Sequence, residues 1–219
     1  PCDDSVVRVA GDLVIPVRRA RGYVPQSVRV EIDGPPVLAV GGHHKNTFCL
    51  LREGEAILSQ HIGDLGSLEV MEYFGRAVEH FRRLFQTTPQ IVAHDLHPGY
   101  LSTQYAQSLE GVRLVPVQHH HAHVAACMAE NGLDGTVLGV SWDGTGLGTD
   151  GTVWGGEFLV ATRAGFRRAA HLRTFRLPGG DAAVREPRRS ALGVLREALG
   201  AEALDRRDLA PVAAFAPTE

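Results

Sequence analysis

Four of the chain's eleven histidines lie together in the run QHHHAH at residues 118–123. If this run opens a helix, His119 and His123 are four residues apart, so their rings lie on one helical face and can reach one divalent ion. His120 and His123, three residues apart, form a second candidate pair. The alternative is a histidine-rich surface turn, but four histidines in front of an alanine-rich segment favour a metal site.

Asp143 is the best candidate for an oxygen ligand to the same ion. Two imidazoles usually need such a ligand, and Asp143 follows the apolar run at residues 137–141, which is typical of a buried strand. Strand ends of this kind face the cleft in α/β folds. The alternative is that Asp143 only starts the turn DGTG at residues 143–146. Imidazole with carboxylate suits iron and zinc alike, so the sequence does not identify the metal.

Two glycine-rich segments of similar form each follow a predicted strand, GGHHKNT at residues 41–47 and DGTGLG at residues 143–148. Glycines in such turns let backbone N–H groups approach a phosphate, and Lys45, the only lysine of the chain, offers a compact positive charge. Neither segment matches the P-loop or the dinucleotide fingerprint, and two ordinary hairpin turns are the alternative. The candidate nucleotide-binding residues here are Gly41, Gly42, Lys45, Asn46, Thr47, Gly144 and Gly146.

A third glycine segment lies at residues 179–187, with the sequence GGDAAVREP. Gly179 and Gly180 precede a predicted helix that begins at Asp181 and carries Arg185, which is an anion-receptive combination. The alternative is a helix that Asp181 caps and whose arginines are solvated.

Composition narrows the classes of protein. The chain has 219 residues, 44% of them hydrophobic and 21% charged, which is typical of a globular protein, and its apolar runs are shorter than the ~18 residues of a membrane helix. A net charge of -3 gives no reason to bind nucleic acid or a membrane surface. Three widely spaced cysteines without a Cys-x-x-Cys pair fit a reduced cytoplasm. Because the chain begins without Met or a signal segment, we expect an internal piece of a longer protein.

The order of predicted elements points to a two-lobed α/β fold. Each lobe opens with a strand, a glycine turn and a hairpin, as in the actin, sugar-kinase and Hsp70 architecture, where a nucleotide lies between two ribonuclease-H-like lobes. In residues 1–33 we expect two short strands, at residues 5–9 and 13–17, and an exit linker. We then expect a complete first lobe at 34–133 and a truncated second lobe at 134–219, with exposed apolar surface. The predicted strands are at residues 37–40, 47–51, 56–60, 91–93, 114–117, 137–141, 153–160 and 167–175, and the predicted helices at 65–86, 100–109, 119–130 and 181–199.

Several of these segments together resemble the hydrogenase-maturation carbamoyltransferase family HypF, in its Kae1-like domain. The resemblance covers almost all of residues 37–189, and residues 3–25 resemble the end of the preceding YrdC-like domain. The runs that carry it are AVGGHHKNTFCL from Ala39, SQHIGDLGSLE from Ser59, DLHPGYLSTQYA from Asp95, VQHHHAHVAACMAE from Val117, WDGTGLGTDGTVWGGEF from Trp142 and LPGGDAAVREP from Leu177.

The resemblance implies a function. In the family, carbamoyl adenylate made from carbamoyl phosphate and ATP delivers its carbamoyl group to the C-terminal cysteine of the partner HypE, for the cyanide ligand of [NiFe] hydrogenase. It implies that His119, His123 and Asp143 bind a divalent iron or zinc ion at the reaction centre, with a further aspartate ligand outside this chain. Mg²⁺ can accompany the nucleotide.

This sequence departs from the family pattern at two places. His43 and His44 stand where the family commonly has an acidic residue and leucine, and Arg188 follows Pro187 where tryptophan is usual. Both departures concern the nucleotide contacts rather than the metal ligands. Two other functions stay open at this point: an O-carbamoyltransferase that acts on a small-molecule hydroxyl, and an ATP-binding module that transfers no group.

Overall fold

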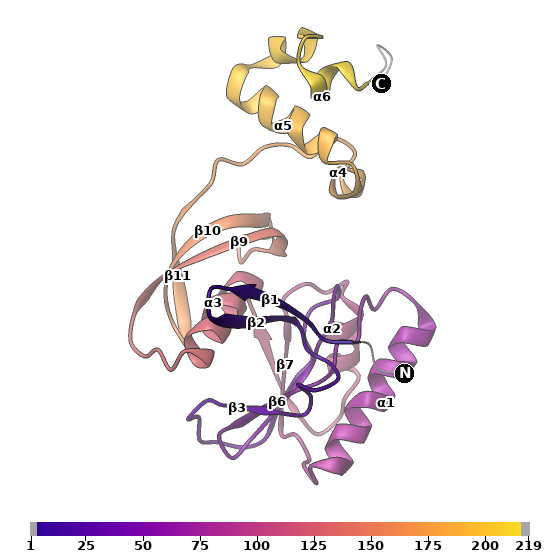
Figure 1. Cartoon of the computed structure of the whole chain (residues 1–219), viewed down its shortest axis with the longest axis vertical. Helices are drawn as coiled ribbons and strands as arrows, with labels where there is room; N and C mark the ends of the chain where they lie inside the picture. Colours follow the sequence, from indigo (N-terminus) through magenta and orange to yellow (C-terminus); the bar gives the residue numbers. More distant parts are fainter. Residues whose placement is uncertain (1–3, 216–219) are drawn as a thin grey trace. The chain divides into compact units, whose positions relative to one another are not determined.

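The structure, a computed structural model, describes residues 4–215. The described chain forms two compact units that divide between His171 and Leu172 (Figure 1). The first unit contains β1 Val6–Ala10, β2 Leu13–Arg18, β3 Ser27–Arg29, β4 Val37–Ala39, β5 Cys49–Arg52, β6 Glu55–Leu58, α1 Leu68–Leu84, β7 Ile91–Asp95, α2 Leu101–Gln107, β8 Arg113–Val117, α3 His119–Glu130, β9 Val137–Leu147, β10 Val153–Thr162 and β11 Gly165–His171. The second unit contains α4 Asp181–Arg185, α5 Pro187–Leu199, the 3-10 helix η1 Ala201–Asp205 and α6 Ala210–Ala213.

The larger sheet of the first unit brings several predicted loops to one edge. Within residues 4–215 its strand order is β3-β6-β5-β4-β7-β8, and β4, β7 and β8 run parallel. Ala39 pairs with Ala93, and Asp95, at the end of β7, pairs with Val117, at the end of β8. The glycine loop after β4, the carboxylate of Asp95 and the start of α3 therefore follow strand ends at the same edge, where α/β folds commonly place their sites.

Helices α1 and α2 pack on the larger sheet through a common apolar core. Ser67 caps α1 by accepting a hydrogen bond from the Val70 N–H, and the apolar residues that follow recur at helical spacing. Phe48, Phe74 and Phe81 meet edge to face at this core. Its buried members are Leu38, Val40, Phe48, Ile57, Ile62, Leu65, Phe74, Ala77, Val78, Phe81, Val92 and Ala106.

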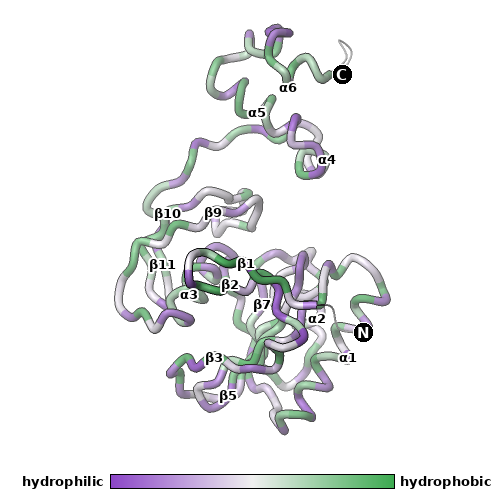
Figure 2. The backbone as a smooth tube through the Cα atoms, in the orientation of Figure 1, coloured by the Kyte–Doolittle hydropathy of each residue, from purple (hydrophilic) through white to green (hydrophobic). Residues whose placement is uncertain are grey.

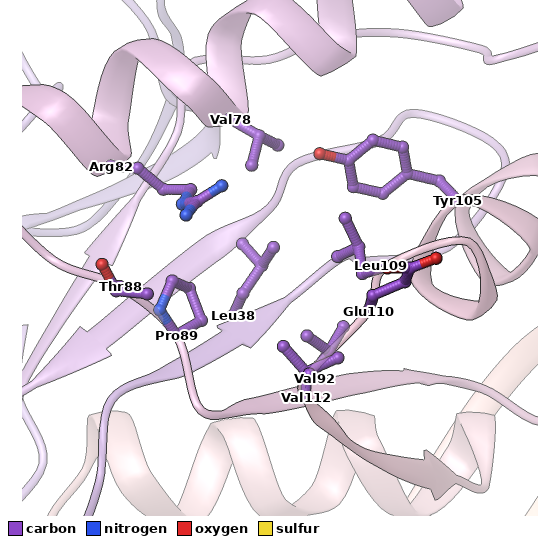
Figure 3. Close-up of a pocket in the computed structure, with 11 residues that line it drawn as sticks. Leu38, Val78, Arg82, Thr88, Pro89, Val92, Tyr105, Leu109, Glu110 and Val112 are labelled. Carbon is purple, nitrogen blue, oxygen red and sulfur yellow. The ribbon is translucent and has the colours of Figure 1, made fainter.

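A small cavity of about 130 Å³ lies beside this core (Figure 3). Leu38, Val78, Val92 and Tyr105 line it with apolar surface, and the polar side chain of Arg82 also reaches it. None of the predicted site residues lines this cavity. It is a packing feature of the first unit rather than part of the histidine site.

The second sheet has the order β11-β10-β9, antiparallel throughout, and α3 packs on it. Its strand β9 corrects one expectation, because the glycine segment at residues 143–148 is not a turn of the kind seen at residues 41–47. Gly146 pairs with Trp154 inside the ladder, and the turn comes later, where the Gly148 N–H donates to the Thr152 carbonyl. Asp143 therefore lies within a strand instead of at its end.

The β1–β2 hairpin forms a two-stranded sheet of its own. Its residues are strongly hydrophobic, as Figure 2 shows, yet most of them are exposed, Val9, Leu13 and Val17 to 68–69%. The region expected to be a linker also contributes to the larger sheet, because β3 pairs with β6. This pairing joins residues 27–29 to the sheet of the first unit.

The second unit is helical in its described part. The helix expected over residues 181–199 is divided at Glu186, because Pro187 provides no N–H to continue α4 and instead opens α5. Gly193 of α5 lies directly against the Arg176 backbone, so a side chain at this position would clash. In the part of the chain that the structure describes, no helix is long and apolar enough to cross a membrane.

Candidate metal centre

The histidine run begins α3 as the sequence predicts, and Gln118 anchors its first turn. The Gln118 side chain accepts a hydrogen bond from the His121 N–H at 2.9 Å, which caps the helix. The same buried side chain donates through Nε2 to the Leu147 carbonyl at 3.1 Å. One residue therefore fixes the start of α3 to the end of β9, the strand that carries Asp143.

Three predicted ligands converge at this point. Nε2 of His119 lies 2.9 Å from Oδ2 of Asp143 and 3.2 Å from Nε2 of His123, and the distance between His123 Nε2 and Asp143 Oδ2 is 3.5 Å. In the described part of the chain, these three residues form the group of potential metal ligands whose ligand atoms all lie within 4.8 Å of one another. Two imidazoles and a carboxylate at this spacing fit the donor set of a divalent zinc or iron ion.

Sequence reasoning missed a fourth member of the cluster, Asp95. Its Oδ2 lies 2.7 Å from Nδ1 of His119, on the side of the ring away from Asp143. The strand predicted at residues 91–93 continues to Asp95 in the structure, where Asp95 pairs with Val117 at the end of the next predicted strand. The shared edge of these two parallel strands is the signal that could have found it.

The electrostatics of the cluster follow from its carboxylates. The hydrogen bond to Asp95 raises the pKa of His119, with smaller help from Asp143, and outweighs burial, which lowers it. Burial raises the pKa of Asp143, but the Gly144 N–H and the two facing histidines lower it by more, so that the pKa lies below its usual value. Asp143 is therefore an anion at neutral pH, as a metal ligand requires.

The other two histidines of the run are turned away from the cluster. His120 is fully buried with its ring 6.1 Å from that of Trp154, and burial lowers its pKa. His121 stacks on Phe166, and its Nε2 lies 2.9 Å from the Thr162 carbonyl. The alternative pair of His120 with His123 is not formed, since the first of these rings points into the core.

The loop at residues 41–47 lies beside His119. Gly41 has φ +71°, and a side chain there would clash with the Thr47 carbonyl, so glycine is required. Asn46 is buried and holds the loop closed, because its Nδ2 donates to the carbonyls of Val40 and Gly42. A Cβ on Gly42 would lie 3.9 Å from Cε1 of His119, which measures how close the loop and the histidine are.

Lys45 and Thr47 of the same loop line a cavity of about 730 Å³. The backbone N–H of Lys45 donates to Asp64 at 2.7 Å. That cavity lies between the β1–β2 hairpin, the larger sheet and the last turns of α3, and Arg18, Arg19 and His61 line it as well. A phosphate bound by Lys45 would therefore lie in this cavity, whereas Gly42 lies beside His119.

The remaining predicted contacts are divided between the two units. Gly144 and Gly146 lie in β9, and Gly146 packs directly under the histidine run. Gly179, Gly180, Asp181 and Arg185 belong to the second unit, where Gly180 precedes α4 and Arg185 is in its last turn. Both glycines have positive φ, and the Arg189 side chain lies beside Gly179.

Family models match most of the chain. The model described as HypF Kae1-like domain matches residues 33–130, and the one described as carbamoyltransferase, Kae1-like domain, second subdomain, matches residues 139–215. The chain belongs to the HypF carbamoyltransferase family. Among its HypF relatives, Carbamoyltransferase HypF2 of Cupriavidus necator is 50% identical over 89% of this chain, and Carbamoyltransferase HypF of Synechocystis is 44% identical over 91%.

Solved HypF structures share the fold. A crystal structure of full-length HypF in the phosphate- and nucleotide-bound form matches with a TM-score of 0.85 and 44% identity over 93% of this chain. That of the T. kodakarensis HypF gives 0.78 and 38% over 90%. The actin- and Hsp70-like α/β architecture predicted from the sequence is confirmed. The chain spans 25–28% of the length of these four proteins.

Proposed function

We propose that this chain forms the metal-binding and nucleotide-binding part of an enzyme that transfers a carbamoyl group from carbamoyl adenylate to a protein thiol. The adenylate comes from carbamoyl phosphate and ATP, and the acceptor is the C-terminal cysteine of a HypE-type protein, for cyanide ligand synthesis in [NiFe] hydrogenase maturation. The convergence of His119, His123 and Asp143 in a chain of the HypF family is the observation that carries this proposal. We place the reaction in the cytoplasm.

The residues of the site fit the chemistry of such a transfer. The acceptor thiolate attacks the carbamoyl carbon, a C–S bond forms, the C–O bond to the phosphate breaks and AMP leaves. When bound, a divalent ion supplies a Lewis acid for the carbamoyl or phosphate oxygen, and His119, His123 and Asp143 would hold it. The backbone N–H groups of Lys45 and Asn46 already donate to Asp64 and Gly63, so Gly41 and Gly42 are the loop residues whose N–H groups would stabilise the developing phosphate charge of AMP.

Nucleotide binding by this part of the protein rests on two supports. A relative of 44% identity has been solved in a nucleotide-bound form, and the glycine loop of this chain is closed by Asn46 immediately beside His119. We assign the phosphate contacts to Gly41, Gly42, Lys45, Asn46 and Thr47, with Gly144 and Gly146 near them. Gly179, Gly180, Asp181 and Arg185, which lie in the second unit, stay predicted nucleotide contacts from the sequence.

The test uses the full-length gene product with ATP, carbamoyl phosphate and a peptide that ends in cysteine. We expect mass spectrometry to find the carbamoylated thiol. His119→Ala should slow its formation by at least about 100-fold, because loss of a metal ligand costs more than loss of a residue that only orients a ligand. His80→Ala removes an exposed histidine of α1 and should leave the rate unchanged. Transfer to hydroxyl compounds only would favour the O-carbamoyltransferase, and nucleotide binding without transfer would favour a non-transferring module.

A further inference from the structure

We propose that Asp95 is the positioning residue of the metal centre: its carboxylate fixes the tautomer of His119 that presents Nε2 to the ion. The inference rests on the metal site proposed above and adds a residue to it. Asp95 reaches the cluster through Nδ1 of His119, on the ring edge opposite the ligand atom Nε2, so its effect on the ion passes through the His119 ring.

Both carboxylate oxygens of Asp95 are already committed to donors. Oδ2 lies 2.7 Å from Nδ1 of His119, and Oδ1 accepts the His97 N–H at 2.8 Å. The Asp95 side chain is 6% exposed, against 59% for that of His123. A buried carboxylate with two short hydrogen bonds has little freedom to turn, so the ring it holds has little freedom as well.

The backbone around Asp95 is fixed as firmly as its side chain. Asp95 pairs with Val117 in the parallel ladder, two residues before His119. The buried Thr103 of α2 donates through its hydroxyl to the Asp95 carbonyl at 3.2 Å. The distance between the carboxylate and the ring is therefore set by the sheet and not by a mobile loop.

This geometry selects one tautomer of His119. Asp95 can only accept, so its hydrogen bond keeps a proton on Nδ1, and Nε2 is the nitrogen that loses its proton when the ion binds. The Nε2 lone pair then points toward Asp143 and His123, where the other two ligand atoms lie. Metal-binding histidines commonly have such a carboxylate behind them, and its loss costs about 10- to 100-fold in metal affinity.

The variant Asp95→Asn separates this role from a purely structural one. The bond from the His97 N–H to Oδ1 holds the turn after β7, and an amide oxygen can accept it equally well. In Asp95→Asn the amide oxygen keeps that bond, and the NH₂ group faces Nδ1 of His119 as a donor. The fold is then preserved while the ring is driven to the tautomer with its proton on Nε2, which cannot bind the ion.

The experiment titrates the full chain with Zn²⁺ in competition with a chelator. We expect Asp95→Asn to bind Zn²⁺ about 10- to 100-fold more weakly than the unmodified chain, with a similar far-UV circular dichroism spectrum. Asp134→Asn removes a carboxylate that is 80% exposed and should leave the affinity unchanged. An unmodified chain that binds no Zn²⁺ would refute the metal site itself, whereas equal affinity of Asp95→Asn would refute only the role of Asp95.

A second measurement on the unmodified chain does not depend on how the variant folds. Long-range ¹H–¹⁵N spectra of the chain with ¹⁵N-labelled histidine and Zn²⁺ should show His119 with its proton on Nδ1 and the metal on Nε2. Coordination through Nδ1, or a proton on Nε2 in the zinc-bound chain, would overturn the proposal.

Discussion

Glycine at residue 146 determines how closely the histidine run approaches β9. A Cβ at this position would lie 2.7 Å from Cε1 of His120, closer than folded proteins tolerate, and 3.0 Å from Cβ of His119, which is a tight contact. Gly139, earlier in the same strand, leaves room for Val124 in the same way. These two glycines of β9 therefore serve the packing of α3, and through it the position of the metal ligands.

We predict that Gly146→Ala weakens Zn²⁺ binding and lowers the free energy of unfolding by about 1–3 kcal/mol, the usual cost of overpacking. The added methyl must displace the first turn of α3, which carries His119. Gly165→Ala is the matched control, since a Cβ at that strand glycine meets nothing within 4 Å. Zinc titration and urea unfolding measure both effects, and equal results for the two variants would contradict this role of Gly146.

The sequence singled out the three side chains that converge in the structure, but not the residues that hold them in place. His119 and His123 could be found because two residues that are four positions apart on a helix lie on the same face. Asp95 could not be paired with His119 from spacing, because 24 residues and a strand pairing separate them. The packing of α3 against Gly146 could not be predicted either, because nothing in its sequence neighbours reveals that a helix packs on this strand.

Among the secondary-structure elements, β10 and β11 are joined by one buried ion pair, between Glu157 and Arg168, next to the histidine run. Glu157 of β10 is 1% exposed, and its carboxylate accepts from Nε and Nη2 of Arg168 in β11 at 2.6 and 2.9 Å. The Arg168 guanidinium also lies 4.0 Å from the centre of the Trp154 ring, which packs beside His120. The ion pair therefore holds Trp154 in place, and Trp154 packs against His120 of the histidine run.

We predict that Arg168→Met lowers the free energy of unfolding of this sheet by about 3 kcal/mol, because a buried carboxylate loses its partner. This is the lower end of the usual range, since the Gly155 N–H still donates to Glu157. Arg167→Met, at an exposed position of the same strand, should change stability by less than ~0.5 kcal/mol. Trp142 and Trp154, the chain's two tryptophans, lie in β9 and β10 and report unfolding of the sheet by fluorescence.

The pH dependence gives the same prediction a second check. Burial raises the pKa of Glu157, but the hydrogen bonds from Arg168 and Gly155 lower it by more, so that it lies below its usual 4.5. A lowered carboxyl pKa stabilises the fold above the unfolded pKa, and that stability is lost as the pH falls through the folded pKa. The difference between the unmodified chain and Arg168→Met should therefore shrink below about pH 4.5. A difference independent of pH would contradict the ion pair.

Helices were predicted well where the apolar residues recur at helical spacing over the whole element. The helix at residues 119–130 has the predicted bounds, and the helix at 65–86 is only shorter at each end, as Leu68–Leu84. The strand expected to end at residue 141 continues to Leu147, because its glycines pair in the ladder while favouring turns locally. Long-range pairing decides such segments, and a single sequence does not contain it.

At the scale of the molecule, part of the second sheet is apolar on the face opposite α3. Leu138, Val140 and Trp142 alternate along β9 with buried residues and are 66%, 54% and 72% exposed. The sequence predicted exposed apolar surface in this half of the chain. Rows of this size are typical of surfaces that contact another part of a protein or a partner. The chain spans about a quarter of the length of its Cupriavidus necator relative.

The division into two units predicts where a protease first cuts the chain. Residues 172–176 connect the units without regular structure, and the Arg173 side chain is 76% exposed, whereas the Arg176 backbone packs against Gly193. Brief digestion with trypsin should therefore cut first after Arg173 and leave a stable fragment that contains the phenylalanine core of α1. Arg173→Gln should slow this cut and leave later ones unchanged. If mass spectrometry finds the first cut within α1 instead, at Arg76 or Arg82, the connection between the units is not the weakest part of the chain.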